Sequence, residues 1–184
     1  HDHWLRMETR PARPDGTSEV SMDDCLKSSL RMRPDRIIVG EVRGPEAATL
    51  LTAMNTGHDG SFGSLHANTA SETVNRLINP PMKVPSIMLS GLDLIIIQAR
   101  LHHDGKTKRV ITEVAEVAGM EGDKPRLNAI WKFNPQTGQV EETGIPSKLR
   151  ENICKAAGIT PADFENNVIQ RMDILKGLVD RDIT

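Results

Sequence analysis

The 184 residues suffice for one compact domain with a buried core. Lys and Arg number 23 against 25 Asp and Glu, a formal net charge of -2, so the basic surplus typical of proteins that bind nucleic acid or anionic lipid is absent. Cys25 and Cys154 lie far apart without Cys-x-x-Cys spacing, which favours a reducing compartment over a disulfide framework or a zinc module. We therefore expect a cytoplasmic protein.

The first part of the chain predicts a strand, a loop and a helix. The apolar/polar alternation of residues 4–9 predicts a strand, and the Pro and Gly that follow end it. Ser21 and Asp24 have the spacing of a capping box, and the apolar residues that follow recur at helical spacing until Pro34. Because the chain starts at His1, without an initiator Met or signal peptide, we expect a cut end there.

Two further strands and two further helices alternate up to residue 81. The β-branched run at 36–40 predicts a strand buried on both faces, as in a parallel sheet covered by helices. A second helix is predicted from Pro45 to Asn55, a strand at 61–67, and a third helix that begins with a Thr69 capping box and ends before the two prolines. This alternation is typical of a doubly wound α/β fold.

The remaining sequence predicts an antiparallel sheet and then helices. Longer strands are expected at 93–101, 108–119 and 126–133, separated by turn residues. From about residue 147 the apolar residues recur at helical spacing. No apolar run approaches the roughly 20 residues that span a bilayer, since Asp93 interrupts the best one. We expect no transmembrane segment in this chain.

Glu41 is the strongest candidate for a catalytic residue. It follows directly after the predicted strand at 36–40, at the carboxyl end where α/β folds build their ligand sites. A carboxylate there can hold Mg²⁺ through water, or orient and deprotonate the water that attacks a nucleotide phosphate. Taken alone the segment is a weak signal, because an exposed Glu paired with Arg43 would give the same pattern.

A second candidate segment, NTGHDGSFGSLHAN, carries two histidines among glycines and small hydroxyl residues. Its backbone and imidazole donors can reach a bound phosphate or a neighbouring subunit. His58 and His66 are also candidate metal ligands. No Cys or second His pair is placed to complete a metal site, which favours the phosphate interpretation.

Together, LRMRPDRIIVGEVRGPEA and AMNTGHDGSFGSLHANT resemble the type II/type IV secretion ATPase superfamily, strongly over residues 25–101. In that family the first segment is the Walker B box, whose glutamate aligns with Glu41, and the second is the histidine box, whose histidines align with His58 and His66. The spacing of the two segments, and the sequence that follows, are similar to the branch containing tight-adherence pilus and archaeal pilus or archaellum motors.

The resemblance implies a RecA-like P-loop NTPase core, incomplete at its N-terminus, over residues 1–101. A β-rich extension at 102–145 and a C-terminal helical segment at 146–184 follow it. The family's Walker A loop, whose amides and lysine cradle the phosphates, is missing from this sequence. Gly105-Lys106-Thr107 lacks the upstream glycine and lies in a predicted hairpin turn. We therefore expect this chain by itself to be inactive as an ATP hydrolase.

Four arginines flank the predicted strand that precedes Glu41: Arg31, Arg33, Arg36 and Arg43. The resemblance implies a catalytic role for Arg43 and nucleotide contacts for the other three, directly or across a subunit boundary. The alternative is a solvated helix end with local ion pairs. Arg6 and Arg10 are similar to positions where the family places intersubunit arginines.

For the whole protein, the resemblance implies ATP and Mg²⁺ as cofactors and a homo-hexamer. It also implies a position at the inner face of the cell membrane, and a membrane platform protein as partner for filament assembly or secretion. The alternative is a nonhydrolytic module that only holds subunits together. A nucleic-acid translocase on the same core is disfavoured by the balanced charge and by the histidine box.

Overall fold

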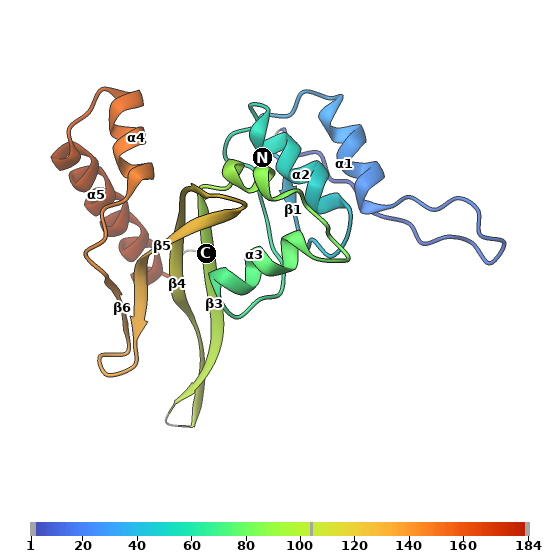
Figure 1. Cartoon of the computed structure of the whole chain (residues 1–184). Coiled ribbons are helices and arrows are strands. Elements are labelled where there is room, and N and C mark those ends of the chain that lie inside the picture. Colours follow the sequence, from blue (N-terminus) through green and yellow to red (C-terminus); the bar gives the residue numbers. More distant parts are fainter. Residues whose placement is uncertain (1–2, 104, 183–184) are drawn as a thin grey trace. The chain divides into compact units, whose positions relative to one another are not determined.

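Figure 1 shows the computed structural model of the chain, which describes residues 3–103 and 105–182. The chain forms two compact units, His1–Ile145 and Pro146–Thr184. The first unit mixes helices with two β-sheets, and the second consists of two helices. The predicted α/β class is confirmed at this level, whereas the expected boundary at residue 101 stays a prediction.

The first helix, α1, spans Met22–Leu30 and begins as predicted. Ser21 Oγ accepts the backbone N–H of Asp24 at 3.2 Å, and the Asp24 carboxylate accepts the Ser21 N–H at 3.0 Å. Both halves of the capping box are therefore present, and they satisfy two of the backbone donors that a helix start leaves free.

The predicted strand at residues 4–9 is wrong. Within described residues 3–20, the only strand-like pairing is an isolated antiparallel bridge between Arg10 and Val20. The apolar residues of this segment are exposed, Trp4 at 67% and Leu5 at 66%. Because no described strand pairs with this segment, its alternation has neither a ladder of hydrogen bonds nor a core to stabilise it.

The strands β1 (Ile38–Val39) and β2 (Phe62–Gly63) form a short parallel pair. Both are shorter than the predicted strands at 36–40 and 61–67. Val39 is buried in the core, but Ile38 and Phe62 are 55% and 57% exposed. The prediction of burial on both faces is therefore wrong for this chain, because the core covers only one face of the pair.

A helix follows each of these strands, as predicted: α2 spans Glu46–Asn55 and α3 spans Ala70–Ile78. The predicted capping box of α3 forms only in part. Thr69 Oγ accepts the Glu72 N–H at 3.0 Å, but the Glu72 carboxylate accepts the N–H of Asn68, at 2.8 Å, rather than that of Thr69. The predicted order of helix, strand, helix, strand and helix is confirmed.

The core of the first unit lies where these elements meet a 3-10 helix, η1 (Ser86–Gly91), and the next strand, β3 (Leu94–His103). The sequence did not predict η1. Residues from all of these helices and from both sheets share one buried cluster, which includes Leu26, Val39, Leu51, Val74, Leu89, Ile95 and Ala115. This cluster fixes the two sheets against the helices.

The second sheet is antiparallel, with its strands in sequence order. After β3 come β4 (Lys106–Glu121), β5 (Lys124–Asn134) and β6 (Gln139–Glu142). The first three strands confirm the prediction, and the short, polar β6 was not predicted. Gly105 lies in the β3–β4 turn and Lys106 pairs with His103, which confirms that Gly-Lys-Thr here belongs to a hairpin.

The second unit consists of α4 (Lys148–Ala157) and α5 (Pro161–Asp180), which confirms the predicted helical segment. Gly158, at φ +65°, ends α4 in the left-handed conformation that glycine adopts without strain. Arg150 joins the two helices, with Nη1 3.3 Å from Glu165 Oε2. None of the helices described in residues 3–103 and 105–182 has the length and apolar character needed to cross a membrane.

Packing around η1 can be tested with two residues of the same helix. Leu89 is fully buried, whereas Ile87 is 70% exposed. We expect Leu89→Ala to lower the free energy of unfolding by about 2–5 kcal/mol, because a cavity remains. Ile87→Ala should cost less than about 0.5 kcal/mol. Urea unfolding followed by circular dichroism measures both, and equal losses in the two variants would contradict this packing.

Candidate active site

The segments that follow β1 and β2 stay hydrogen-bonded beyond the paired strand residues. The Ser64 N–H donates to the Val39 carbonyl oxygen at 3.3 Å, and the Val42 N–H donates to the Ser64 carbonyl oxygen at 2.7 Å. Parallel strands end at the same edge of a sheet. This extended ladder therefore brings Glu41 and His66 to one edge of the strand pair.

The Glu41 carboxylate contacts two basic side chains. Its Oε1 lies 2.5 Å from Arg43 Nε and 3.1 Å from His66 Nε2. Arg43 Nη2 donates to the other carboxylate oxygen, Oε2, at 2.6 Å. The Glu41 side chain is 30% exposed, against 75% for Arg43 and 83% for His66. The guanidinium thus forms a two-point clamp on Glu41, and the imidazole approaches one of the same oxygens.

This clamp has an electrostatic consequence. The hydrogen bond from Arg43 lowers the pKa of Glu41 below its ordinary value, burial opposes this, and the charges of Arg43 and His66 lower the pKa further. Glu41 is therefore ionised at neutral pH. Because the pKa is lowered on folding, the stability from this pair is present above the ordinary glutamate pKa and is lost as pH falls through the folded value.

Glu46 supports the turn behind Glu41. Its side chain is buried, at 8% exposure, and its Oε1 accepts the backbone N–H of Arg43 at 2.6 Å and that of Gly44 at 2.8 Å. The N-cap residue of α2, Pro45, provides no side-chain hydrogen bond. Sequence reasoning missed Glu46, although an acidic residue in the first turn of a helix after Gly-Pro is a signal for such a cap.

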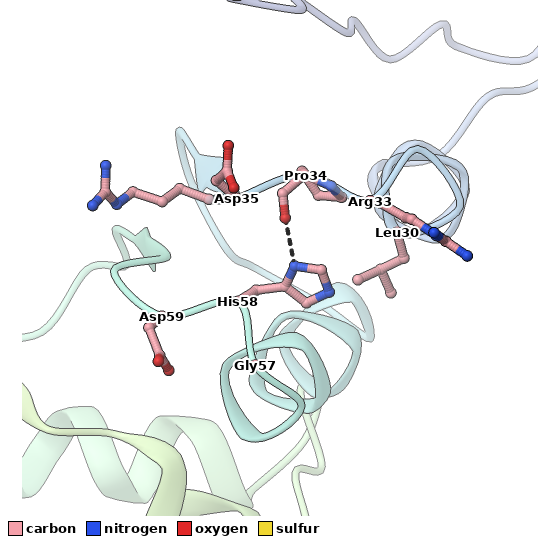
Figure 2. A pocket seen from close by; sticks show the side chains of 8 residues that line it. Leu30, Arg33, Pro34, Asp35, Gly57, His58 and Asp59 are labelled. Atoms are coloured by element: carbon pink, nitrogen blue, oxygen red, sulfur yellow. Dashed lines mark hydrogen bonds between the residues drawn. The ribbon is translucent and has the colours of Figure 1, made fainter.

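His58 lies at the other end of the strand pair. Its Nδ1 is 2.7 Å from the Pro34 carbonyl oxygen, and Figure 2 shows the imidazole directed at that oxygen. Because His58 precedes β2 whereas Glu41 follows β1, parallel strands put them at opposite edges. The structure therefore brings His66 to Glu41 but not His58. An open hollow of about 500 Å³ surrounds His58, lined by Leu30, Arg33, Pro34, Asp35, Arg36, Gly57 and Asp59.

The three arginines expected to contact nucleotide, Arg31, Arg33 and Arg36, are exposed and precede β1. Figure 2 shows the Arg33 side chain extending away from His58. Arg36 crosses over Gly60, where a Cβ would lie 2.7 Å from Arg36 Nε. Gly60, at φ +80°, therefore permits both the turn and the approach of the arginine. None of the three lies at the edge that carries Glu41.

In the part of the chain that the structure describes, no group of three or more His, Cys, Asp or Glu side chains is placed to hold a metal ion. His58 and His66 lie at opposite ends of the strand pair, so they do not share a binding site. The alternative of a histidine metal site thus has no support from the geometry. The site that remains is the one around Glu41.

Comparison with known proteins identifies the family. A profile of the family described as "Type II/IV secretion system protein" matches residues 5–156, which include Glu41, Glu46 and both histidines. The chain belongs to this family. The resemblance inferred from the two sequence motifs is therefore confirmed.

Similar proteins come from archaea and bacteria. An uncharacterized protein of Methanocaldococcus jannaschii is 34% identical over 180 residues, 97% of this chain and 66% of its own length. The conjugal transfer protein TrbB of Rhizobium radiobacter is 41% identical over 105 residues, 54% of this chain and 31% of its own. A twitching motility protein of Neisseria gonorrhoeae is 32% identical over 151 residues, which are 77% of this chain and 40% of that protein's length. The chain thus spans 31% to 66% of these relatives' lengths.

Among solved structures, the chain is similar to the VirB11 ATPase from the type IV secretion system of Brucella suis. The TM-score is 0.45 at 31% sequence identity, and the similarity covers 53% of this chain and 32% of that one.

The clamp can be tested by removing the guanidinium. We expect Arg43→Met to raise the pKa of Glu41 towards its ordinary value, because the hydrogen bond from Arg43 is the largest cause of the lowering. Carboxyl ¹³C NMR of labelled glutamate, followed against pH, measures this pKa. Arg76→Met is the matched control, since Arg76 pairs with Glu72 elsewhere in the chain. An unchanged Glu41 pKa in Arg43→Met would contradict the clamp.

Proposed function

We propose that the chain is the Walker B and histidine-box part of an ATPase motor subunit. The motor couples ATP hydrolysis to the assembly of pilin-like filaments, in a type IV pilus or an archaellum, or to protein secretion. The observation that carries the proposal is the ionised Glu41 carboxylate beside His66, at the carboxyl edge of a parallel strand pair. Membership of the type II/IV secretion family supports it, as do relatives named for conjugal transfer and twitching motility.

We propose a RecA-like core, incomplete at its N-terminus, over residues 1–101 of the first unit. The connection from β1 through α2 to β2 is a parallel β-α-β unit, the building block of doubly wound sheets. In such units α/β folds bind their ligands at the carboxyl ends of the strands, which is where the proposed catalytic carboxylate of Glu41 lies. The order of α1, β1, α2, β2 and α3 supports this fold.

ATP and Mg²⁺ are the proposed cofactors, with the metal supplying charge neutralisation on the phosphates. Glu41 offers one carboxylate, which fits a metal held through water better than direct chelation. Its buried Oε1 lies close to Arg43 Nε and His66 Nε2 but receives no hydrogen bond of ordinary geometry, so this oxygen can accept a hydrogen from water once the guanidinium moves away. In hydrolysis Glu41 orients the attacking water and accepts its proton.

His66 and Arg43 act on the same carboxylate. His66 Nε2, 3.1 Å from Glu41 Oε1, can orient the carboxylate or donate to a phosphate oxygen. Arg43 keeps Glu41 ionised and carries positive charge to the site. We propose that Arg31, Arg33 and Arg36, on the opposite edge, contact nucleotide or acidic groups across a subunit boundary. For His58, which does not reach Glu41 within the chain, a catalytic role stays a prediction.

The proposed assembly is a homo-hexamer in the cytoplasm, docked at the inner face of the cell membrane on a platform protein. Hydrolysis at one subunit then passes a conformational change around the ring to the platform. No nucleic-acid partner is proposed, since the net charge of -2 provides no basic surplus for phosphate contacts.

The role of Glu41 is tested in the natural protein that carries this sequence. We expect Glu41→Gln to lower ATP turnover by about 10²–10⁴-fold, the usual worth of a general base, while ATP binding stays near normal because the side-chain volume is kept. A coupled phosphate-release assay and equilibrium nucleotide binding measure the two effects. Turnover close to wild type would refute the role, and a wild-type protein that binds without hydrolysing would favour the nonhydrolytic module.

A second prediction separates the two histidines. His66→Ala should lower turnover without releasing a metal, because His66 contacts the proposed base. His58→Ala should lower thermal stability more than His66→Ala does, because it removes the bond between His58 and the Pro34 carbonyl oxygen from a partly buried position. Phosphate release, thermal unfolding and metal analysis measure these effects. Stoichiometric zinc or iron that is lost with either substitution would overturn this interpretation.

A further inference from the structure

We propose that Glu46 is a positioning residue: its buried carboxylate fixes the turn that aims Arg43 at Glu41 and thereby sets the geometry of the proposed base. The inference rests on the proposed function, since it assumes that Glu41 reacts with water. In the described part of the chain Glu46 makes no hydrogen bond or ion pair with Glu41, so it acts through the backbone of Arg43 and Gly44.

The contacts of Glu46 converge on one short turn. A single oxygen, Oε1, accepts two consecutive backbone N–H groups, from Arg43 at 2.6 Å and from Gly44 at 2.8 Å. Charge-assisted hydrogen bonds of this kind are stronger than those between neutral groups. The side chain is only 8% exposed, so water has little access to compete for either donor.

The N–H group that precedes these two, that of Val42, is bonded to the segment after β2. Val42 donates to the Ser64 carbonyl oxygen at 2.7 Å, and its side chain is buried in the core. Three successive amides, from Val42 to Gly44, are therefore bonded, the first to the segment after β2 and the other two to Glu46. With its backbone fixed in this way, Arg43 can turn back onto Glu41, two residues earlier in the chain.

Gly44 leaves room for this arrangement. A Cβ at Gly44 would lie 3.1 Å from Glu46 Oε2, which is tighter than ordinary van der Waals contact. Any side chain at this position pushes against the carboxylate that holds the turn. The absence of a side chain at Gly44 and the burial of Glu46 are thus two independent features that serve the same contact.

Substitutions at position 46 can separate the effect of the accepting oxygen of Glu46 from the effect of its charge. Gln at position 46 keeps the carbonyl oxygen that accepts both amides and loses only the charge. Ala removes the acceptor and leaves two partly buried backbone N–H groups, those of Arg43 and Gly44, without a side-chain partner. Glu72→Ala is a matched control: Glu72 also lies in the first turn of a helix and accepts a backbone N–H from just before that helix, but its contacts are with Asn68 and Arg76.

The first readout is spectroscopic and does not depend on hydrolysis. The guanidinium of Arg43, whose Nη2 donates to Glu41 Oε2 at 2.6 Å, should give a shifted ¹⁵Nη NMR signal in this chain. We expect Glu46→Ala to abolish that signal and to speed amide exchange at residues 43 and 44 roughly tenfold, the worth of a hydrogen bond. Glu46→Gln and Glu72→Ala should keep the signal, and Gly44→Ala, which retains Glu46, should weaken it.

The second readout is kinetic, in the natural protein. Glu46→Ala should lower kcat for ATP roughly 10- to 100-fold with little change in KM, because the base is misplaced while the nucleotide contacts remain. Glu46→Gln should restore most of the turnover, which a role in net charge alone would not allow.

The two proposals fail in different ways. Normal turnover in Glu41→Gln removes the proposed function, whatever Glu46 does. An Arg43 Nη signal that is unchanged in Glu46→Ala, or that is lost equally in Glu46→Gln, removes the positioning role. If Glu46→Ala does not fold, Gly44→Ala decides: a wild-type signal and wild-type kcat in that variant overturn the inference.

Discussion

The candidate site depends on the backbone ladder that joins the segments after β1 and β2. Two paired residues in each strand would not by themselves hold a catalytic geometry, because a short parallel pair has few hydrogen bonds. The bond from Val42 to the Ser64 carbonyl oxygen extends the pairing to the point where Glu41 and His66 emerge. The buried side chains of Val39 and Val42 anchor the same stretch in the core. Site and core are thus coupled through the stretch from Val39 to Val42, which includes Glu41.

Local signals in the sequence predicted the parts of the fold that depend on neighbours along the chain. The Ser21 capping box, the helix after Pro45 and the β3–β4 hairpin each follow from residues a few positions apart. Parallel strands joined by a helix end at one edge, so Glu41 and His66 meet there, although no contact between them was predicted from the sequence. The helix starts and the hairpin turn could therefore be inferred from each segment alone, without knowing how the segments pack.

The features that sequence reasoning missed depend on distant parts of the molecule. Alternation at residues 4–9 looked like a strand, but a strand exists only with a partner ladder, which the described chain does not provide there. Burial of both faces was expected for the strand at 36–40, yet Ile38 is half exposed because the core meets one face only. Glu46 was missed because its role depends on burial. Glu46 and Glu72 both lie in the first turn of a helix, and no local pattern shows that only the Glu46 side chain is buried.

The Glu41 clamp also sets a requirement on any catalytic cycle. Arg43 contacts both carboxylate oxygens, and His66 approaches one of them, so the arrangement that keeps Glu41 ionised also crowds the atoms that must accept a proton. In its proposed role as base, Glu41 offers one oxygen to water, so Arg43 has to give up at least one of its two contacts. Its side chain is 75% exposed and its backbone is held by Glu46, so the guanidinium can move while the turn stays in place. An anionic phosphate near the exposed guanidinium competes with Glu41 for it, which would free the base only when nucleotide is present.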